Sequence, residues 1–291
     1  MKLTGVMPAL VTPFDENGNI NFGVFEQLLT KLRADGVKGW VPCGSTGEYN
    51  ALTANERASV LKFVAEFANK DELLIAGTNA GSTWEVIEHT KRARDIGYRT
   101  VLLSSPFYAT PAPNELIAHY RSVLEAVDVE IVLYNYPPKV GVEVGLDVLD
   151  AFVDEPRVIG IKESSGNLRR AMDIRSRYGD RYQVTNGSDD QTLDFYLWGA
   201  TSWICGPANC MAKACVDLVN TIESGDWLAA RDKMQIIYAA MSSLESGKFV
   251  QKVKYGCELA GTPVGLGRKP LLALTSDEKA AFEKAMEPVL G

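Results

Sequence analysis

Short runs of apolar, mostly β-branched residues alternate along this chain with longer stretches in which apolar residues recur every three or four positions. The short runs predict buried strands, and the longer stretches predict amphipathic helices. The predicted strands are residues 5–11, 39–43, 73–77, 100–103, 131–134, 158–162, 183–186 and 202–205. The helices predicted between them include residues 21–35, 53–68, 82–96, 113–126, 167–178 and 212–224.

Eight such repeats in about 225 residues, with nearly continuous apolar strands, predict an α/β fold, a closed parallel (β/α)8 TIM barrel. The competing fold is a doubly wound open sheet, which more often carries a glycine-rich dinucleotide fingerprint after its first strand. Here Thr12-Pro13-Phe14-Asp15 follows that strand, and the chain contains no GxGxxG motif. After about Gly225 only helices are predicted, at 226–241, 248–259 and 276–290. We therefore predict a barrel of residues 1–224 and a small C-terminal helical region of residues 225–291 packed on it.

Composition argues against several classes of partner but does not identify the function. The formal net charge is −7 and no basic stripe is present, which argues against a nucleic-acid partner. No apolar run approaches the roughly 20 residues that span a bilayer, so a membrane partner is not expected. The five cysteines and two histidines form no zinc-type cluster, so we expect no metal site. With no secretion signal recognised, a reducing, cytoplasmic location fits best.

The strand ends are where a barrel of this kind carries its chemistry, and polar residues follow seven of the eight predicted strands. Lys162 ends the apolar run that begins at Val158. An amine at the mouth of a core is desolvated, which disfavours its charged form, and a neutral amine can attack a carbonyl to form a Schiff base. Taken alone, the run more often indicates an exposed lysine at the end of a strand.

Two further strand ends carry groups that could act together with Lys162 on a carbonyl substrate. The turn Gly44-Ser45-Thr46-Gly47 offers two hydroxyls and closely spaced backbone N–H groups, which can hold a carboxylate. Tyr134 ends the fifth strand, next to the strand of Lys162, and its hydroxyl could relay protons. The alternatives are an ordinary Ser/Thr turn and a core tyrosine with its hydroxyl satisfied.

Together these motifs resemble, over essentially the full length, the dihydrodipicolinate synthase / N-acetylneuraminate lyase family of class I Schiff-base lyases. The resemblance rests on three ordered motifs and two shorter segments. The motifs are Gly44-Ser45-Thr46-Gly47-Glu48, Tyr134-Asn135-Tyr136-Pro137 and Gly160-Ile161-Lys162-Glu163-Ser164-Ser165-Gly166-Asn167, and the segments are Val11-Thr12-Pro13-Phe14 and Asn186-Gly187-Ser188-Asp189-Asp190.

The resemblance implies a role for each matching residue. Lys162 would condense with the keto carbon of pyruvate or a longer 2-oxo acid, and Tyr134 would be the general acid/base beside it. Ser45 and Thr46 would bind the 2-oxo acid carboxylate. Tyr108 would reach a neighbouring subunit's site and complete a hydroxyl relay with Ser45 and Tyr134, in a homo-oligomer that is usually a dimer of dimers.

The resemblance also places Gly187, Asp189, Ile204 and Lys139 at the substrate. Because the iminium itself acts as the electron sink, neither a metal nor an organic cofactor is expected.

The choice of second substrate rests on departures from the family pattern. The synthases usually carry an arginine where this chain has Lys139, and a point-charge ammonium does not replace a bidentate guanidinium. The neuraminate lyases usually have a serine where this chain has Pro207, and Trp198 and Trp203 together with Pro207 suggest a drier, more compact pocket.

The leading interpretation is therefore a catabolic lyase for a small 2-oxo acid or cyclic imine, such as a 2-keto-3-deoxy sugar acid or 1-pyrroline-4-hydroxy-2-carboxylate. The alternatives are 4-hydroxy-tetrahydrodipicolinate synthase, which condenses pyruvate with aspartate semialdehyde, and N-acetylneuraminate lyase. A non-catalytic homologue that binds a 2-oxo acid is the alternative from a different class.

Overall fold

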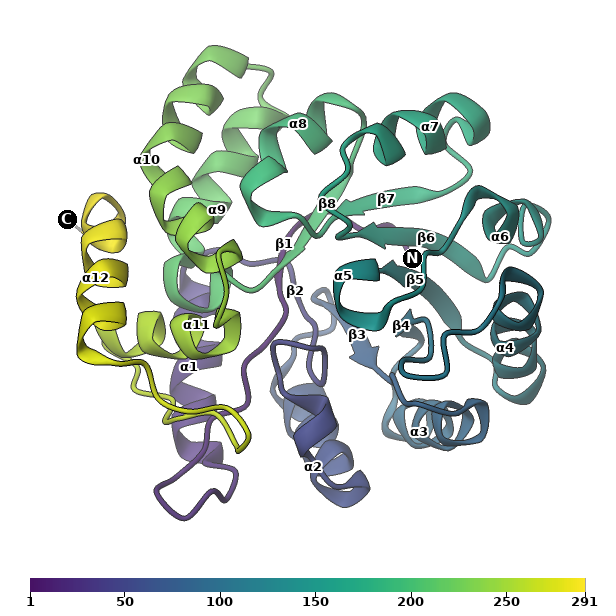
Figure 1. The fold of residues 1–291 in the computed structure, drawn as a ribbon, viewed down its shortest axis with the longest axis horizontal. Coiled ribbons are helices and arrows are strands. Elements are labelled where there is room, and N and C mark those ends of the chain that lie inside the picture. Colours follow the sequence, from purple (N-terminus) through teal and green to yellow (C-terminus); the bar gives the residue numbers. More distant parts are fainter. Residues whose placement is uncertain (291) are drawn as a thin grey trace.

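The computed structural model describes residues 1–290, and its centre is a ring of parallel strands (Figure 1). The strands are β1 (Gly5–Pro8), β2 (Gly39–Trp40), β3 (Leu73–Gly77), β4 (Thr100–Ser104), β5 (Glu130–Asn135), β6 (Val158–Glu163), β7 (Gln183–Asn186) and β8 (Ser202–Cys205). Neighbours pair in the order β1-β8-β7-β6-β5-β4-β3-β2. Backbone N–H groups of Lys38 and Val41 donate to the carbonyls of Val6 and Pro8 at 2.9 and 3.1 Å, which closes the ring between β1 and β2. The predicted (β/α)8 barrel is confirmed.

The first two strands are shorter than the patterns at residues 5–11 and 39–43 predict. Beyond Pro8, pairing continues only as a single parallel bridge between Ala9 and Val41. Pro42 has no N–H to donate, and Cys43 has a φ of 58°, in the left-handed region. The chain therefore leaves the sheet early and enters the turn at Gly44.

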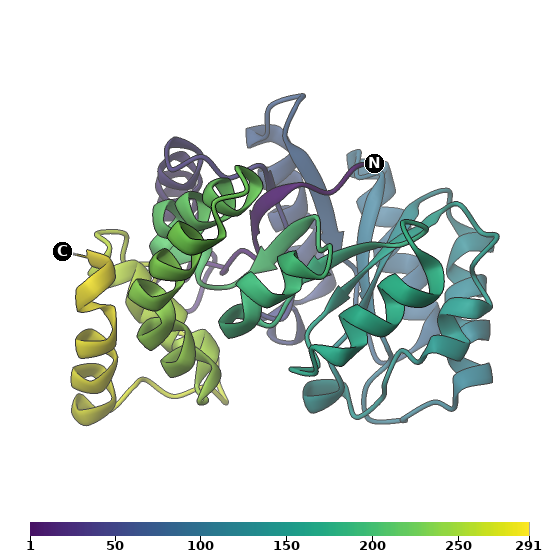
Figure 2. The same ribbon diagram turned by 90° about the horizontal axis from the view of Figure 1, so that it is seen from above.

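Helices surround the ring, as the two views show (Figures 1 and 2). They are α1 (Phe22–Ala34), α2 (Ala54–Phe67), α3 (Thr83–Ile96), α4 (Pro113–Ala126), α5 (Pro137–Val140), α6 (Leu146–Asp150), α7 (Arg169–Tyr178), α8 (Thr192–Leu197) and α9 (Ala208–Glu223). Two single-turn 3₁₀ segments, η1 (Tyr49–Ala51) and η2 (Asp189–Gln191), follow β2 and β7. The sequence pattern predicts neither α5 nor α6, because four or five residues are too short to show a helical period.

The C-terminal residues form α10 (Trp227–Glu245), α11 (Phe249–Leu259) and α12 (Ser276–Leu290). Figure 1 places them beside α9 on one side of the barrel, and α10 and α11 both contact α9. The division at residue 224 into two regions stays a prediction. No helix within residues 1–290 is both long and apolar enough to cross a membrane.

Side chains alternate between the two faces of each strand, so the apolar residues of the strands form two layers, one inside the barrel and one under the helices. Residues such as Met7, Val132 and Ile204 fill the inside of the barrel, whereas residues such as Leu133 and Trp203 pack between the sheet and the helices. Tyr134 belongs to the inner set, and its parallel register partner on β6 is Lys162. Both side chains therefore point inward at the carboxyl end of the ring.

Candidate active site

A cavity of about 580 Å³ opens at the carboxyl ends of the strands. Both the barrel and the C-terminal region line it. From the barrel come Ser45, Thr46, Glu48, Tyr49, Asn50, Ala51, Ser104, Phe107, Tyr134, Tyr136, Lys139, Val140, Lys162, Gly187, Asp189, Ile204 and Gly206, and from the C-terminal region Glu245, Lys248, Phe249, Val250, Gln251, Arg268, Pro270 and Leu271. The cavity thus gathers every residue that the family resemblance implies for catalysis or substrate binding, except Tyr108.

Lys162 lines this cavity and is only 6% exposed. Its Nζ is 4.5 Å from the centroid of the Tyr134 ring. Burial lowers the pKa of the Lys162 ammonium, and the nearby Asp189 carboxylate opposes that shift. A lysine held in this way has a larger fraction of its neutral, nucleophilic form than a lysine in water.

Tyr134 is placed to exchange protons with groups bound at Lys162. Burial raises the pKa of its phenol, while hydrogen bonding with the side chains of Ser164 and Ser45 lowers it. The ring also stacks on Tyr136, with centroids 5.6 Å apart. A protonated phenol beside an amine whose pKa is lowered is suited to donating a proton to a leaving hydroxyl.

A buried ion pair between Glu48 and Lys254 holds the turn that carries Ser45 and Thr46. Glu48 ends the turn with a φ of 57°, and its carboxylate lies 2.7 Å from Nζ of Lys254 on α11. The other carboxylate oxygen of Glu48 accepts the backbone N–H of Arg268 at 2.8 Å. The C-terminal region therefore holds the hydroxyl-bearing turn in place at the cavity wall.

Gly187 closes the cavity wall beside the lysine. A Cβ built on it would lie 2.0 Å from Oγ of Ser164 and 2.6 Å from Cε of Lys162, so a side chain there would displace both. Asp189 follows, buried, with its Oδ1 accepting the indole N–H of Trp203 at 2.9 Å. Burial raises the pKa of Asp189, Glu245 raises it further, and Lys162 lowers it.

The predicted contribution of Trp198, Trp203 and Pro207 to the pocket is wrong. None of the three lines the cavity. Ile204 points into the barrel, so its neighbour Trp203 points outward and packs under the helices. Trp198 is 40% exposed at the end of α8. The apolar wall instead comes from residues to which the sequence analysis assigns no role in the pocket, chiefly Tyr49, Phe107, Tyr136, Val140, Phe249, Val250 and Leu271.

Sequence reasoning also missed Glu245, which lies at the end of α10 and lines the cavity. Although the residue as a whole is exposed, partial desolvation of its carboxyl group and the nearby Asp190 raise its pKa, whereas the backbone N–H of Asp189 and then the Lys162 and Lys139 ammonium groups lower it. An acid at the end of a distant helix gives no local signal, because only the tertiary fold brings it to the strand ends.

Tyr108 lies outside the cavity of its own chain. Its side chain is 98% exposed, and its φ of 71° is in the left-handed region. The single chain therefore brings together Lys162, Tyr134, Ser45 and Thr46 but not Tyr108.

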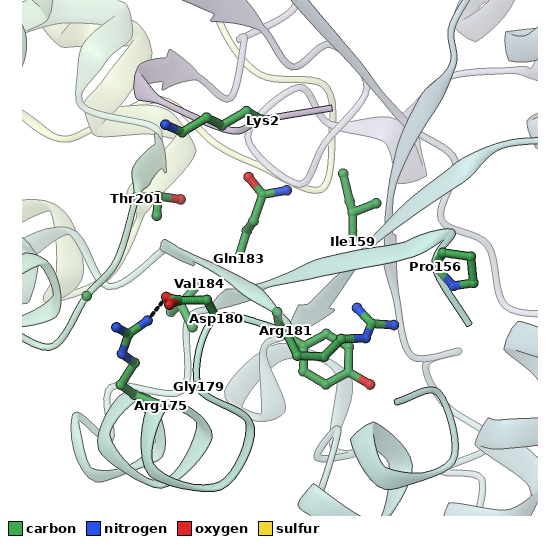
Figure 3. Close-up of a pocket in the computed structure, with 12 residues that line it drawn as sticks. Lys2, Pro156, Ile159, Arg175, Gly179, Asp180, Arg181, Gln183, Val184 and Thr201 are labelled. Atoms are coloured by element: carbon green, nitrogen blue, oxygen red, sulfur yellow. Dashed lines mark hydrogen bonds and ion pairs between the residues drawn. The ribbon is translucent and has the colours of Figure 1, made fainter. Parts of the chain in front are cut away.

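A second hollow, of about 450 Å³, lies near the amino ends of β6 and β7 (Figure 3). Three of its polar side chains already have internal partners. Arg175 pairs with Asp180, Arg181 donates to four backbone carbonyls, and Gln183 bonds to the backbone of Met1 and Leu3. No group of three or more His, Cys, Asp or Glu side chains within residues 1–290 is arranged to hold a metal ion.

Comparison of the sequence with known proteins identifies the family of this chain. The dihydrodipicolinate synthetase family profile matches residues 2–288. A 4-hydroxy-tetrahydrodipicolinate synthase from Methanosarcina barkeri is 35% identical over 286 residues, covering 96% of each chain, and one from an Exiguobacterium species is 31% identical over 284 residues, covering 98% of this chain and 97% of its own.

Solved structures of dihydrodipicolinate synthases superpose closely on this chain. A chloride-inhibited dihydrodipicolinate synthase from Acinetobacter baumannii, complexed with pyruvate, superposes with a TM-score of 0.95 at 29% identity, covering 99% of each chain. A monomeric dihydrodipicolinate synthase variant superposes with a TM-score of 0.92 at 25% identity, covering 98% of this chain and 96% of its own.

Proposed function

The chain belongs to the dihydrodipicolinate synthetase family of class I, aldolase-type lyases, and we propose that its Lys162 forms a Schiff base with pyruvate. The observation that carries the proposal is the buried Lys162, with its lowered pKa, whose Nζ lies beside the Tyr134 ring in the wall of the cavity. The similarity to a synthase solved with pyruvate supports the same substrate.

The first half of the reaction follows from these groups. The neutral Lys162 amine adds to the keto carbon, and the Ser45-Thr46 turn holds the substrate carboxylate. Tyr134 gives a proton to the carbinolamine hydroxyl, which leaves as water and produces the iminium. Loss of a proton from the neighbouring methyl group then gives an enamine, whose carbon is the nucleophile of the second half.

For the second half we propose condensation with aspartate semialdehyde, the reaction of a 4-hydroxy-tetrahydrodipicolinate synthase. The enamine carbon attacks the aldehyde carbon, and the aldehyde oxygen takes up a proton. The amine of the second substrate, after losing a proton, attacks the iminium carbon and releases Lys162 as the free amine. The names of the relatives support this alternative better than the catabolic lyase favoured by the sequence pattern.

Lys139 stands where the family's synthases usually have an arginine, so a synthase function requires a role for this lysine. It lines the cavity from α5. We propose that its ammonium pairs with the carboxylate of the second substrate in place of the family's usual arginine. The catabolic lyase stays a second candidate, because Asp189 and Glu245 supply acceptors for substrate hydroxyl groups on the same wall.

We also propose that the protein is a homo-oligomer in which Tyr108 enters the partner's cavity. The nearly complete exposure of this aromatic side chain supports an arrangement in which another chain covers it. The monomeric variant among the structural relatives makes the oligomeric state a property to measure for this chain.

Borohydride trapping tests the proposed Schiff base. Borohydride reduces an iminium to a stable secondary amine, so protein incubated with pyruvate and borohydride should gain mass at Lys162. The Lys162→Ala protein should gain none. An unmodified wild-type protein would favour the non-catalytic binding homologue. Michaelis constants for aspartate semialdehyde and for small hydroxylated 2-oxo acids then separate the synthase from the catabolic lyase.

A further inference from the structure

The carboxylate of Glu163, the residue after the proposed nucleophile, is held entirely by other groups of the protein. Glu163 ends β6 and is 0% exposed. Its oxygens accept hydrogen bonds from Nδ2 of Asn135 at 3.0 and 2.9 Å, from the backbone N–H of Ser165 at 2.8 Å and from Nε of Arg170 at 2.8 Å. Because side chains alternate along a strand, Glu163 points outward where Lys162 points into the barrel. Since burying a charge costs free energy even when it is paired, an apolar side chain would serve packing at least as well.

The bonds between Asn135 and Glu163 join the two strand ends that carry the reacting groups. Parallel register places Tyr134 opposite Lys162 and, one residue further on, Asn135 opposite Glu163. The backbone N–H of Ser164 also donates to the carbonyl of Asn135 at 2.9 Å. The side-chain bonds therefore act directly beyond the reacting pair, where β5 and β6 both end.

Pairing between β5 and β6 is irregular at its other end. The register shifts between Ile131 and Val132, so Ile159 on β6 is an extra residue. A bulge of this kind disrupts the ladder locally, and a slip of one residue turns every side chain to the opposite face. Such a slip would turn the lysine out of the cavity. The register at the reacting pair must therefore be held by the contacts above the bulge, which include the bonds between residues 135 and 163.

Arg170 on α7 completes this arrangement. It pairs with Glu163, and both side chains are buried. Its Nη2 donates to the carbonyl of Val144 at 2.6 Å, and the backbone N–H of Val144 donates to Oδ1 of Asn135 at 2.9 Å. Both ends of the Asn135 amide are thus held, so its orientation toward the carboxylate is fixed.

We propose that Glu163 is a positioning residue for Schiff-base formation. Its hydrogen bonds to Asn135 keep β5 and β6 in register, and with them the Lys162 amine opposite the Tyr134 phenol. Arg170 supplies the counter-charge for the buried carboxylate. This inference rests on the proposed function and adds to it a residue that points away from the cavity and on which the rate of the first step depends.

Two double variants that differ only at residue 163 test the inference. Glu163→Gln/Arg170→Met removes the buried ion pair but keeps an oxygen that can accept the hydrogen bond from Asn135. Glu163→Met/Arg170→Met removes that oxygen as well, with a side chain of similar size. Displacement of a catalytic group by about 1 Å costs on the order of 10²-fold in rate. At saturating pyruvate, the first variant should form the borohydride-trapped adduct at nearly the wild-type rate, and the second about 10²-fold more slowly.

The pyruvate concentration that gives half the maximal rate separates positioning from a general weakening of the fold. The Ser45-Thr46 turn lies between β2 and α2, so this concentration should stay near the wild-type value in both variants. Urea unfolding should show both variants fully folded under the conditions of the assay. Glu155→Met/Arg157→Met, which removes an ion pair of 2.8 Å next to the opposite end of β6, is the control and should change neither the rate nor the half-saturating concentration.

The possible failures are distinguishable. Equal rates in the two double variants would show that the hydrogen bond to Asn135 does not position the lysine, and the Schiff base would stand. The same conclusion follows if Glu163→Met/Arg170→Met does not fold, or if its slower rate comes with a matching rise in the half-saturating pyruvate concentration, because Glu163 would then be structural. If wild-type protein gives no trapped adduct, the proposed function itself is wrong.

Discussion

Burial of the Lys162 side chain has a cost that depends on pH. Its pKa in the folded protein lies below the ordinary value of 10.5, so between those two values the unfolded chain binds more protons than the folded one. Stability should therefore rise with pH through that window and be lost again as pH falls through the folded pKa. The same shift means that Lys162 is neutral, and so nucleophilic, at a lower pH than a lysine in water.

We predict that Lys162→Met removes this pH dependence and the borohydride-trapped adduct together. Methionine has a similar shape and no charge, so the variant should be at least as stable as wild type near neutral pH. Urea unfolding at several pH values, compared between the two proteins, measures the difference. A variant that unfolds much more readily than wild type would identify Lys162 as a structural lysine instead.

Removal of the Tyr134 hydroxyl should affect turnover and leave the fold unchanged. We predict that Tyr134→Phe lowers kcat by about 10²–10⁴-fold, the usual size of a lost general acid/base. Tyr136→Phe keeps the stacked pair of rings and should lower kcat far less. Steady-state kinetics with both variants make the comparison, and near-normal turnover in Tyr134→Phe would remove this tyrosine from the proposed role.

A single methyl group at Gly187 should misplace the nucleophile. Because a Cβ there would lie within 2.6 Å of Cε of Lys162, the lysine must move, and displacement of a catalytic group by about 1 Å costs on the order of 10²-fold in rate. We expect that loss of kcat/KM in Gly187→Ala. Gly23→Ala, in α1 with only an ordinary contact at 3.6 Å, is the control and should keep full activity.

At the level of elements, α11 supports the turn that we propose binds the substrate carboxylate. The Lys254–Glu48 pair is almost fully buried, so Lys254→Met would leave an unpaired carboxylate in the interior. We predict a loss of about 3–5 kcal/mol in the free energy of unfolding, together with a higher KM for pyruvate. The double variant Lys254→Met/Glu48→Gln should recover part of the stability, since it removes the buried charge. Denaturant titration and pyruvate kinetics measure both effects.

The strand ends were predictable from sequence, whereas the rest of the cavity was not. An apolar run that stops on Lys162, or on Tyr134, is a local pattern, and the barrel geometry turns neighbouring strand ends into one site. The prediction for Trp203 is wrong because successive side chains of a strand point to opposite faces, so Trp203 faces the helices when its neighbour Ile204 faces the inside of the barrel. Glu245 and Phe249 could not be found in this way, because helix packing brings them to the cavity from far along the chain.

At the scale of the whole molecule, we propose that two chains together make each complete site. The exposed Tyr108 predicts that each site takes this tyrosine from its partner. Tyr108→Phe and Lys162→Ala should each be impaired alone, but a mixed oligomer contains some sites with Lys162 from one chain and Tyr108 from the other. Co-expression of the two variants with different tags, followed by purification through both, isolates such oligomers. We expect turnover well above that of either parent, with sedimentation confirming an oligomer. A mixed oligomer no more active than its parents would place Tyr108 outside the reaction, and a monomer with full activity would show that one chain makes the whole site.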